Sequence, residues 1–254
     1  MSAASIDFGI VAPALAAGLL VTATHVPLGI RVLQRGIVFI DLAVAQIAGL
    51  GVVVADWLGF EPQGAAVQVA ALAAALAGAL LLHWTEQRWP EVQEAVIGVT
   101  FVVAANAAIL LLAANPHGAE HLKELLIGQV LWVRPATLAW VALAYAVILA
   151  LWFALGERIG RIGFYLLFAC AVTVSVQQVG LYLVFATLIV PALATRGFER
   201  GRLAAAYALG VVGYASGLAL SLATDLPPGP LIVCAMTALG LATFALGPRA
   251  RGAG

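Results

Sequence analysis

The sequence is poor in charged residues: Asp, Glu, Lys and Arg make up 9% of its 254 residues, whereas hydrophobic residues make up 64%. A soluble domain carries about 25% charged residues, so this composition excludes a chain that faces water on all sides. The twelve basic and twelve acidic residues cancel, so no excess of charge points to nucleic acid. The composition therefore predicts an integral membrane protein in a lipid bilayer.

Several chemical signatures are also missing. The two cysteines, Cys170 and Cys234, stand far apart and outside any CxxC spacing, which indicates small packing residues and not a disulfide or metal site. No G-x-x-x-x-G-K-[ST] pattern occurs, so any ATP hydrolysis must take place on another chain. We therefore expect neither an enzyme nor a cofactor bound to this chain.

Long uncharged segments make up most of the sequence. Each can cross a hydrocarbon core about 30 Å thick as a helix that rises about 1.5 Å per residue. The alternation that is typical of barrel strands is absent. These runs predict an all-α integral membrane fold, a polytopic bundle of about eight to nine transmembrane helices in a single domain over residues 1–254. The clearest runs are Ala95–Ala114, Ala136–Leu155, Ile162–Thr195, Leu203–Thr224 and Leu226–Pro248.

Basic residues mark alternate connectors, as the positive-inside rule expects of cytoplasmic loops. They gather at Arg31–Arg35, at Glu157–Arg161, at Arg196–Arg202 and near the C-terminus. We therefore expect these connectors and the C-terminus in the cytoplasm and the N-terminus outside. Of the twelve Lys and Arg residues, only Lys123 and Arg134 then lie on the outer side.

One uncharged run, Ile162–Thr195, has 34 residues, or about 51 Å as a helix, which is too long for one span and too short for two full ones. Both of its ends are basic and therefore cytoplasmic. We predict one full span, a break near residues 177–180, and a second short or re-entrant arm that ends at Pro191. Irregular backbone at membrane depth needs protein or water beside it, so Gln177 and Gln178 are candidates for lining an ion pathway.

Four stretches resemble the zinc/manganese family of ABC importer permeases, in the order in which that family has them. They are PLGIRVLQRGIVFIDLAVAQIAGLG (27–51), QEAVIGVTF with LKELLIGQVLWV (93–133), VQQVGLYLVFATLIVPALATR (176–196) and DLPPGPLIVC (225–234). The resemblance implies a permease subunit of a zinc or manganese importer in the bacterial inner membrane, with alternating access driven by ATP on a partner. It also implies those partners: a second permease copy forming a homodimer, cytoplasmic ATP-binding subunits, and a periplasmic or lipoprotein metal-binding protein.

The connector Gly156–Gly163 departs from the family, which has a longer loop there with a short helix that fits the ATPase. Coupling through this connector then relies on a stub built on Glu157 and Arg158. The loop Arg196–Arg202 and a partner permease are the other routes. The short connector also keeps an alternative function open, an ATPase-independent secondary carrier or channel for metal ions or another small solute. A non-transporting partner in a hetero-oligomer is a third interpretation.

Two acids and a glutamine are candidates for gates along the pathway. Asp41 is expected near the cytoplasmic interface, either as a helix N-terminal acid that pairs with Arg35 or Arg31, or as a gate residue. Gln46 lies about 140° further around the helix, where the family often has a histidine, and is expected to be a polar pore or interhelical contact. Asp225, in the outer DLPPGP turn, is either a gate or a turn residue.

The outer connector holds His117, Glu120 and His121, which formally match the H-x-x-E-H pattern of a peptidase. A connector of about 20 residues does not provide the packed domain that peptidase chemistry needs. Two histidines four residues apart, with Glu120 between them, can hold Zn²⁺ or Mn²⁺ at the entrance of a pathway. The alternatives are solvated loop residues or a docking surface for the binding protein.

The remaining polar residues receive structural interpretations. His25 is expected to be a packing or interfacial histidine, and Asn106 is expected to face the bundle or a cavity, because lipid offers no hydrogen bonds. The acids Glu86, Glu91 and Glu94, together with Arg88, are expected to form a solvated cytoplasmic face.

Overall fold

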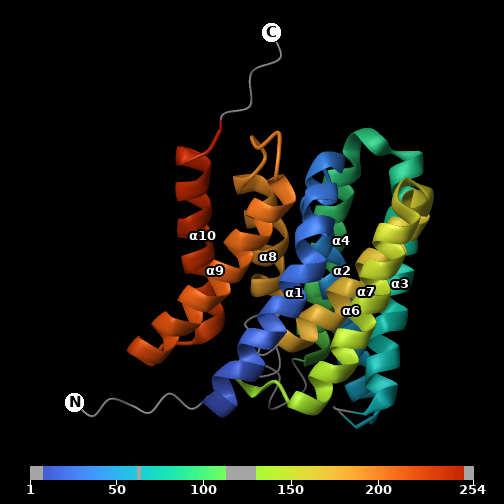
Figure 1. Ribbon diagram of the computed structural model, residues 1–254. Coiled ribbons are helices and arrows are strands. Elements are labelled where there is room, and N and C mark those ends of the chain that lie inside the picture. The colour runs from blue at the N-terminus through green and yellow to red at the C-terminus, as the bar shows by residue number, and fades with distance from the viewer. Residues whose placement is uncertain (1–7, 62–63, 113–129, 249–254) are drawn as a thin grey trace. The chain divides into compact units, whose positions relative to one another are not determined.

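The computed structural model describes residues 8–61, 64–112 and 130–248, and this part of the chain is built from helices without any strand (Figure 1). The order of the elements is α1 (Phe8–Arg35), α2 (Ile40–Trp57), α3 (Ala65–Arg88), η1 (Pro90–Val92), α4 (Gln93–Leu112), η2 (Val130–Trp132), α6 (Pro135–Leu155), η3 (Gly156–Ile159), α7 (Gly160–Val179), α8 (Leu181–Ala194), α9 (Arg202–Thr224) and α10 (Pro228–Leu246), where η denotes a 3₁₀ helix.

Eight of these helices are long and apolar enough to cross a membrane, and α8 is a shorter apolar helix. Their outward-facing side chains are apolar too: Leu110 is 74% exposed, Trp140 74% and Leu246 88%. Large apolar side chains on the outside of a helix bundle suit contact with lipid, since a soluble protein rarely exposes them in such number. The predicted all-α membrane fold is therefore confirmed.

Two compact units make up the chain. One contains α8, α9 and α10 with most of α1 and the first part of α6, and the other contains α2, α3, α4 and α7 with the second part of α6. Each unit is assembled from segments that are far apart in the sequence. A single transmembrane domain over residues 1–254 stays a prediction.

In the first unit, small residues let the helices approach closely. The Cα atom of Gly29 in α1 lies against the carbonyl oxygen of Leu188 in α8, and a methyl group at Gly29 would overlap that oxygen. Along α9, Gly217 lies in the same way against the backbone of Ile232 in α10. Small residues at helix interfaces are the usual basis of packing in lipid, where no hydrophobic effect drives helices together.

The second unit is centred on α2, which packs against both α3 and α4. Gly51 of α2 faces the backbone of Ala70 in α3, and Gly78 of α3 faces the side chain of Ile47 in α2. On the other side of α2, Val53 joins Ala108 and Leu112 of α4 in a buried apolar cluster. The first turn of α2 is buried too, and it contains the predicted gate residue Asp41.

The long uncharged run breaks where its length predicted. The helix α7 ends at Val179, Gly180 follows with φ 82°, and α8 begins at Leu181. A positive φ of this kind is easy for glycine and strained for other residues, so Gly180 is suited to interrupt the helix. The second arm is longer than predicted, because α8 continues through Pro191 to Ala194. Pro191 lies inside α8 and has no backbone N–H, so one i→i−4 hydrogen bond of this helix is missing there.

Two local features remain. The segment around Pro27 is helical, because α1 continues through Pro27 to Arg35 as a helix of 28 residues. Transmembrane helices tolerate proline in this way because neighbouring groups satisfy the freed backbone atoms. Of the two cysteines, which are both free thiols, Cys170 is half-buried but Cys234 is exposed, so only Cys170 fits the interpretation as a packing residue.

Candidate functional site

Asp41 is the most deeply buried acid among the described residues. It lies in the first turn of α2, its exposed fraction is 0%, and neither carboxylate oxygen has a hydrogen-bond partner in the described part of the chain. A buried and unpaired carboxylate is costly in a membrane protein, so such a group usually serves a function. Gln46, one turn further along α2, is also buried, with 8% of its surface exposed.

The start of α2 is held by an acid from another helix. The backbone N–H of Phe39, just before α2, donates a hydrogen bond of 3.2 Å to Oε1 of Glu94 in the first turn of α4. This carboxylate accepts one of the N–H groups that a helix N-terminus leaves without an intrahelical partner. Glu94 is half-buried, and its Oε2 has no hydrogen-bond partner among the described residues. The prediction that Glu94 belongs to a solvated face is therefore wrong.

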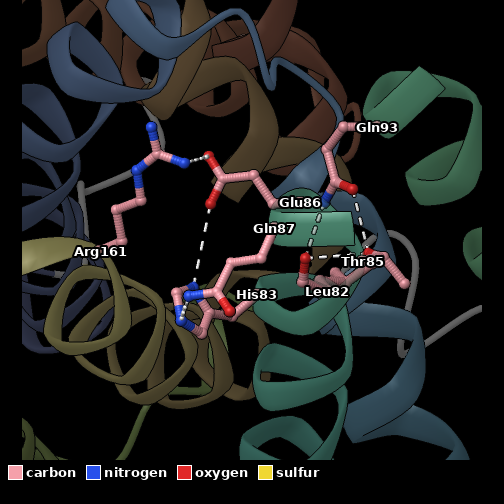
Figure 2. Close-up of polar contacts among 7 residues, drawn as sticks. All are labelled: Leu82, His83, Thr85, Glu86, Gln87, Gln93 and Arg161. Atoms are coloured by element: carbon pink, nitrogen blue, oxygen red, sulfur yellow. Dashed lines mark hydrogen bonds and ion pairs between the residues drawn. The ribbon is translucent and has the colours of Figure 1, made fainter. Parts of the chain in front are cut away.

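Nearby, a buried glutamine ties the end of α3 to the start of α4 (Figure 2). The side-chain amide of Gln93 donates to the carbonyl oxygen of Leu82 at 2.8 Å. The Thr85 hydroxyl lies 3.0 Å from Gln93 Oε1 and 2.9 Å from the same carbonyl, and donates to one of them. Neutral groups therefore satisfy one another here, and they fix the last turns of α3.

On the neighbouring turn of α3, Glu86 lies between a histidine and an arginine (Figure 2). Its Oε2 is 3.9 Å from His83 Nδ1, and its Oε1 is 4.0 Å from Nη1 of Arg161 at the start of α7. The side chains of His83 and Glu86 are only 12% and 13% exposed. Glu86 is thus not part of a solvated face either, whereas Arg88 and Glu91 are exposed as predicted.

The glutamines of the helix break differ in exposure. Gln177 is exposed and Gln178 is half-buried, in the last turn of α7 before Gly180. The break that motivated these two candidates is present, and their role in lining a pathway stays a prediction.

Asp225 ends α9 in a left-handed conformation with φ 54°, and it is exposed. Next to it, the hydroxyl of Ser221 donates a hydrogen bond of 2.6 Å to the carbonyl oxygen of Leu226. Asp and Asn adopt left-handed backbone more readily than other side chains, so the turn itself accounts for Asp225. The gate role of Asp225 stays a prediction.

Some predicted site residues are not among the residues that the structure describes. His117, Glu120 and His121 lie outside the described residues. The stub of the short connector forms the 3₁₀ helix η3, and Arg158 within it is exposed; the side chain of Glu157 lies outside the description. Positive φ angles at Gly156 and Gly160, 50° and 65°, delimit this single turn.

Two polar residues bond to carbonyl oxygens of their own helices. Asn106 is exposed and its amide donates to the carbonyl oxygen of Val102 at 2.8 Å, so the expectation that Asn106 faces the bundle is wrong. His25 is fully buried, as a packing histidine should be. Its Nδ1 lies 3.1 Å from the carbonyl oxygen of Val21, so that nitrogen carries the proton, and Nε2 has no hydrogen-bond partner among the described residues.

Comparisons with known proteins agree with this arrangement. The family model described as the ABC 3 transport family matches residues 7–159 and 154–247. The fold resembles a solved chain of PsaBC from Streptococcus pneumoniae in complex with Fab, with a TM-score of 0.79, 19% identity, and coverage of 96% of this chain and 94% of that one. A second solved structure, a metal-chelate type ABC transporter in an inward-facing conformation, has a TM-score of 0.70 and 14% identity, with coverage of 96% and 91%.

Proposed function

Because the chain belongs to the ABC 3 transport family, we propose that it is the permease subunit of an ATP-binding-cassette importer for divalent metal ions, zinc or manganese. The match of the family model to nearly the whole chain carries this proposal. Eight helices of membrane-spanning length and the interrupted segment α7–α8 support it.

The proposed transporter is a complex. Two copies of this chain form the membrane pathway as a homodimer, separate ATP-binding subunits dock from the cytoplasm, and a periplasmic or lipoprotein partner delivers the metal ion. The absence of a phosphate-binding G-x-x-x-x-G-K-[ST] pattern from the sequence supports a separate ATPase. In this arrangement the protein lies in the bacterial inner membrane with a cytoplasmic C-terminus.

In the proposed mechanism, the metal ion passes sparse polar groups and the pathway opens alternately to each side. Transport requires binding that is strong enough for the ion to enter and weak enough for it to leave. Asp41 and Gln46 are the proposed cytoplasmic gate contacts, and Gln177, Gln178 and Asp225 are the others along the pathway. His117, Glu120 and His121 form the proposed entrance.

Uptake into vesicles tests this function. Purified chain, reconstituted with its ATP-binding subunit, should accumulate radioactive zinc or manganese when ATP is present and not when the ATPase carries an inactivating substitution. Uptake that persists without ATP hydrolysis would contradict the importer.

A second function, an ATPase-independent carrier or channel, draws support from one observation: the connector proposed to contact the ATPase is only the single turn η3. The same vesicles distinguish the two functions. A carrier would accumulate metal ions under an ion gradient from the chain alone, whereas the importer requires its ATPase.

A further inference from the structure

The buried ring of Phe164 lies between the two helices that the turn η3 connects. Phe164 is near the start of α7, the helix that follows η3 directly, and only 1% of its surface is exposed. The centre of its ring lies 6.1 Å from the centre of the Trp152 ring in the last turn of α6, the helix that precedes η3. Phe164 therefore packs the helices on the two sides of this turn against each other.

A cation from another helix covers the same ring. The guanidinium carbon of Arg35, the last residue of α1, lies 4.2 Å from the centre of the Phe164 ring. A cation within about 6 Å of an aromatic face is attracted to it, and the attraction is stronger where water is excluded, as it is around this buried ring. Arg35, Trp152 and Phe164 all belong to the second compact unit. Their contact fixes the end of α1 on the start of α7.

The start of α7 is also held on α3. Nη1 of Arg161 lies 4.0 Å from Oε1 of Glu86 (Figure 2). The ring of Tyr165 packs against the imidazole of His83, with 5.5 Å between the ring centres. The first turns of α7 are therefore attached to α3 on one side and, through Phe164, to α1 on the other. A displacement of these turns acts on both helices, because close-packed groups transmit strain and do not absorb it.

The end of α1 is joined closely to the start of α2. Residues 36–39 alone separate Arg35 from Ile40, where α2 begins. The backbone N–H of Ile40 donates a hydrogen bond of 3.2 Å to the carbonyl oxygen of Ile37, whose side chain is buried. A connector this short has little slack, since each residue spans at most about 3.6 Å. A displacement of Arg35 therefore reaches the first turn of α2, which contains Asp41.

We propose that the contact between Arg35 and Phe164 transmits movements of η3 to the gate at the start of α2, and so couples ATP hydrolysis to transport. The proposal rests on the proposed function, in which the ATPase contacts η3 and Asp41 is a gate contact. When the ATPase displaces η3, the start of α7 moves with it, Arg35 follows the ring of Phe164, and the start of α2 follows Arg35. Arg35 and Phe164 are positioning residues in this mechanism.

The number of metal ions accumulated per ATP hydrolysed tests this link, in vesicles that contain the chain and its ATP-binding subunit and are supplied with radioactive zinc or manganese. Phe164→Leu keeps an apolar side chain but removes the aromatic face, and Arg35→Gln removes the positive charge. Each should lower the ratio by about 5-fold while ATP hydrolysis continues. A loss of stability alone would lower uptake and hydrolysis together and leave the ratio unchanged.

A matched control and a double variant separate this contact from other effects. Phe168 is fully buried one turn further along α7 and stacks on Phe164 with 5.6 Å between the ring centres. Phe168→Leu therefore removes a buried ring from the same helix but keeps the ring that Arg35 contacts, and it should keep the ratio. The double variant Arg35→Gln/Phe164→Leu should be no worse than either single variant, because both substitutions remove the same contact.

The link is overturned if Phe164→Leu keeps the ratio of the unmodified protein, or if Phe168→Leu lowers it as much as Phe164→Leu does. It is also overturned if the losses of the two single variants multiply in the double variant, because Arg35 and Phe164 then act independently. Failure of the proposed function gives a different result. If the unmodified protein accumulates metal ions without ATP hydrolysis, the importer function is overturned and the link to an ATPase with it, whereas ATP-driven uptake with an unchanged ratio in Phe164→Leu overturns the link alone.

Discussion

Gly29 in α1 and Leu188 in α8 bring their two helices into backbone contact, because the space for a side chain at position 29 is taken by the carbonyl oxygen of Leu188. The same oxygen leaves Gly29 no room to gain even a methyl group. This contact joins two of the stretches that resemble the permease family, PLGIRVLQ and FATLIVPALA, within one unit of the structure.

Gly29→Ala should therefore destabilise the protein. The added methyl group forces α1 and α8 apart, and overpacking of this kind costs about 1–3 kcal/mol. Equilibrium unfolding in mixed micelles measures the loss. Gly98→Ala in α4 is the matched control, because nothing lies within 4 Å of the added methyl group there, and it should stabilise the helix by about 0.5–1 kcal/mol. Equal stability of the two variants would contradict the close approach.

Tyr214→Phe should weaken the attachment of α9 to α8. Thr187 donates its hydroxyl to the carbonyl oxygen of Leu183, so the Tyr214 hydroxyl donates to Thr187 Oγ1 across 3.0 Å in a fully buried position. Hydrogen bonds between membrane helices contribute about 0.6 kcal/mol on average and at most about 1.7 kcal/mol, and we expect about 1 kcal/mol for this buried pair. The same unfolding assay measures it.

Tyr182→Phe is the control for that hydroxyl, since Tyr182 is 52% exposed. Its stability should stay within about 0.5 kcal/mol of the unmodified protein. A Tyr214→Phe variant that unfolds no more easily than Tyr182→Phe would show that the buried hydrogen bond adds nothing.

Substitutions at Asp225 distinguish its two predicted roles, a turn residue and a gate residue. Its backbone is left-handed, with φ 54°, a conformation that Asp and Asn tolerate better than Ala because their short polar side chains can form local hydrogen bonds, so Asp225→Ala should cost about 1 kcal/mol of stability. Asp225→Gly and Asp225→Asn fit this conformation and should keep both stability and metal uptake. If uptake falls in the glycine and asparagine variants while stability is kept, the carboxylate acts in transport.

Two features show which parts of the structure could be predicted from the sequence. The break between α7 and α8 was predictable, because an uncharged run of 34 residues fits neither one span nor two, and glycine stands at the break. The burial of Glu86 was not predictable. The charged residues near it in the sequence, Arg88 and Glu91, are exposed, whereas Glu86 faces Arg161 of α7, a residue 75 positions away that only the tertiary structure brings near.

Among the candidate site residues, Asp41 was expected near the cytoplasmic interface, because an acid in an apolar helix has to avoid lipid; its full burial is known only from the structure. Asn106 shows the limit of the same argument. The amide side chain of Asn106 was expected to face the bundle or a cavity, but it is exposed and bonds to the carbonyl oxygen of Val102 one turn earlier in its own helix. Pattern alone does not separate these two solutions.

Arg158→Glu should impair coupling to the ATPase. Arg158 is exposed in η3, the single turn between α6 and α7, and reversal of its charge should reduce ATP-driven uptake by about 10-fold. The control is Arg134→Glu, an exposed arginine just before α6 that the charge pattern places on the outer side. If both variants transport normally, the ATPase contacts a different loop, such as Arg196–Arg202.

Asp41→Asn should stop transport without loss of stability. The substitution keeps the shape of the side chain but removes a carboxyl group that is fully buried and has no hydrogen-bond partner among the described residues, so the folded state should be as stable as before or more stable. Metal uptake should fall by at least about 10-fold, because a neutral amide attracts a divalent ion far less than a carboxylate does.

Asp56→Asn, in the last turn of the same helix, removes an acid from the opposite end of α2 and is the matched control. It should leave uptake and stability nearly unchanged. The two variants remove an acid from opposite ends of the same helix. If only Asp41→Asn loses metal uptake and its unfolding transition is unchanged, the ion contact lies at the start of α2. If Asp41→Asn instead unfolds more easily and still transports, the carboxylate serves the structure of the helix start, as an acid near a helix N-terminus can.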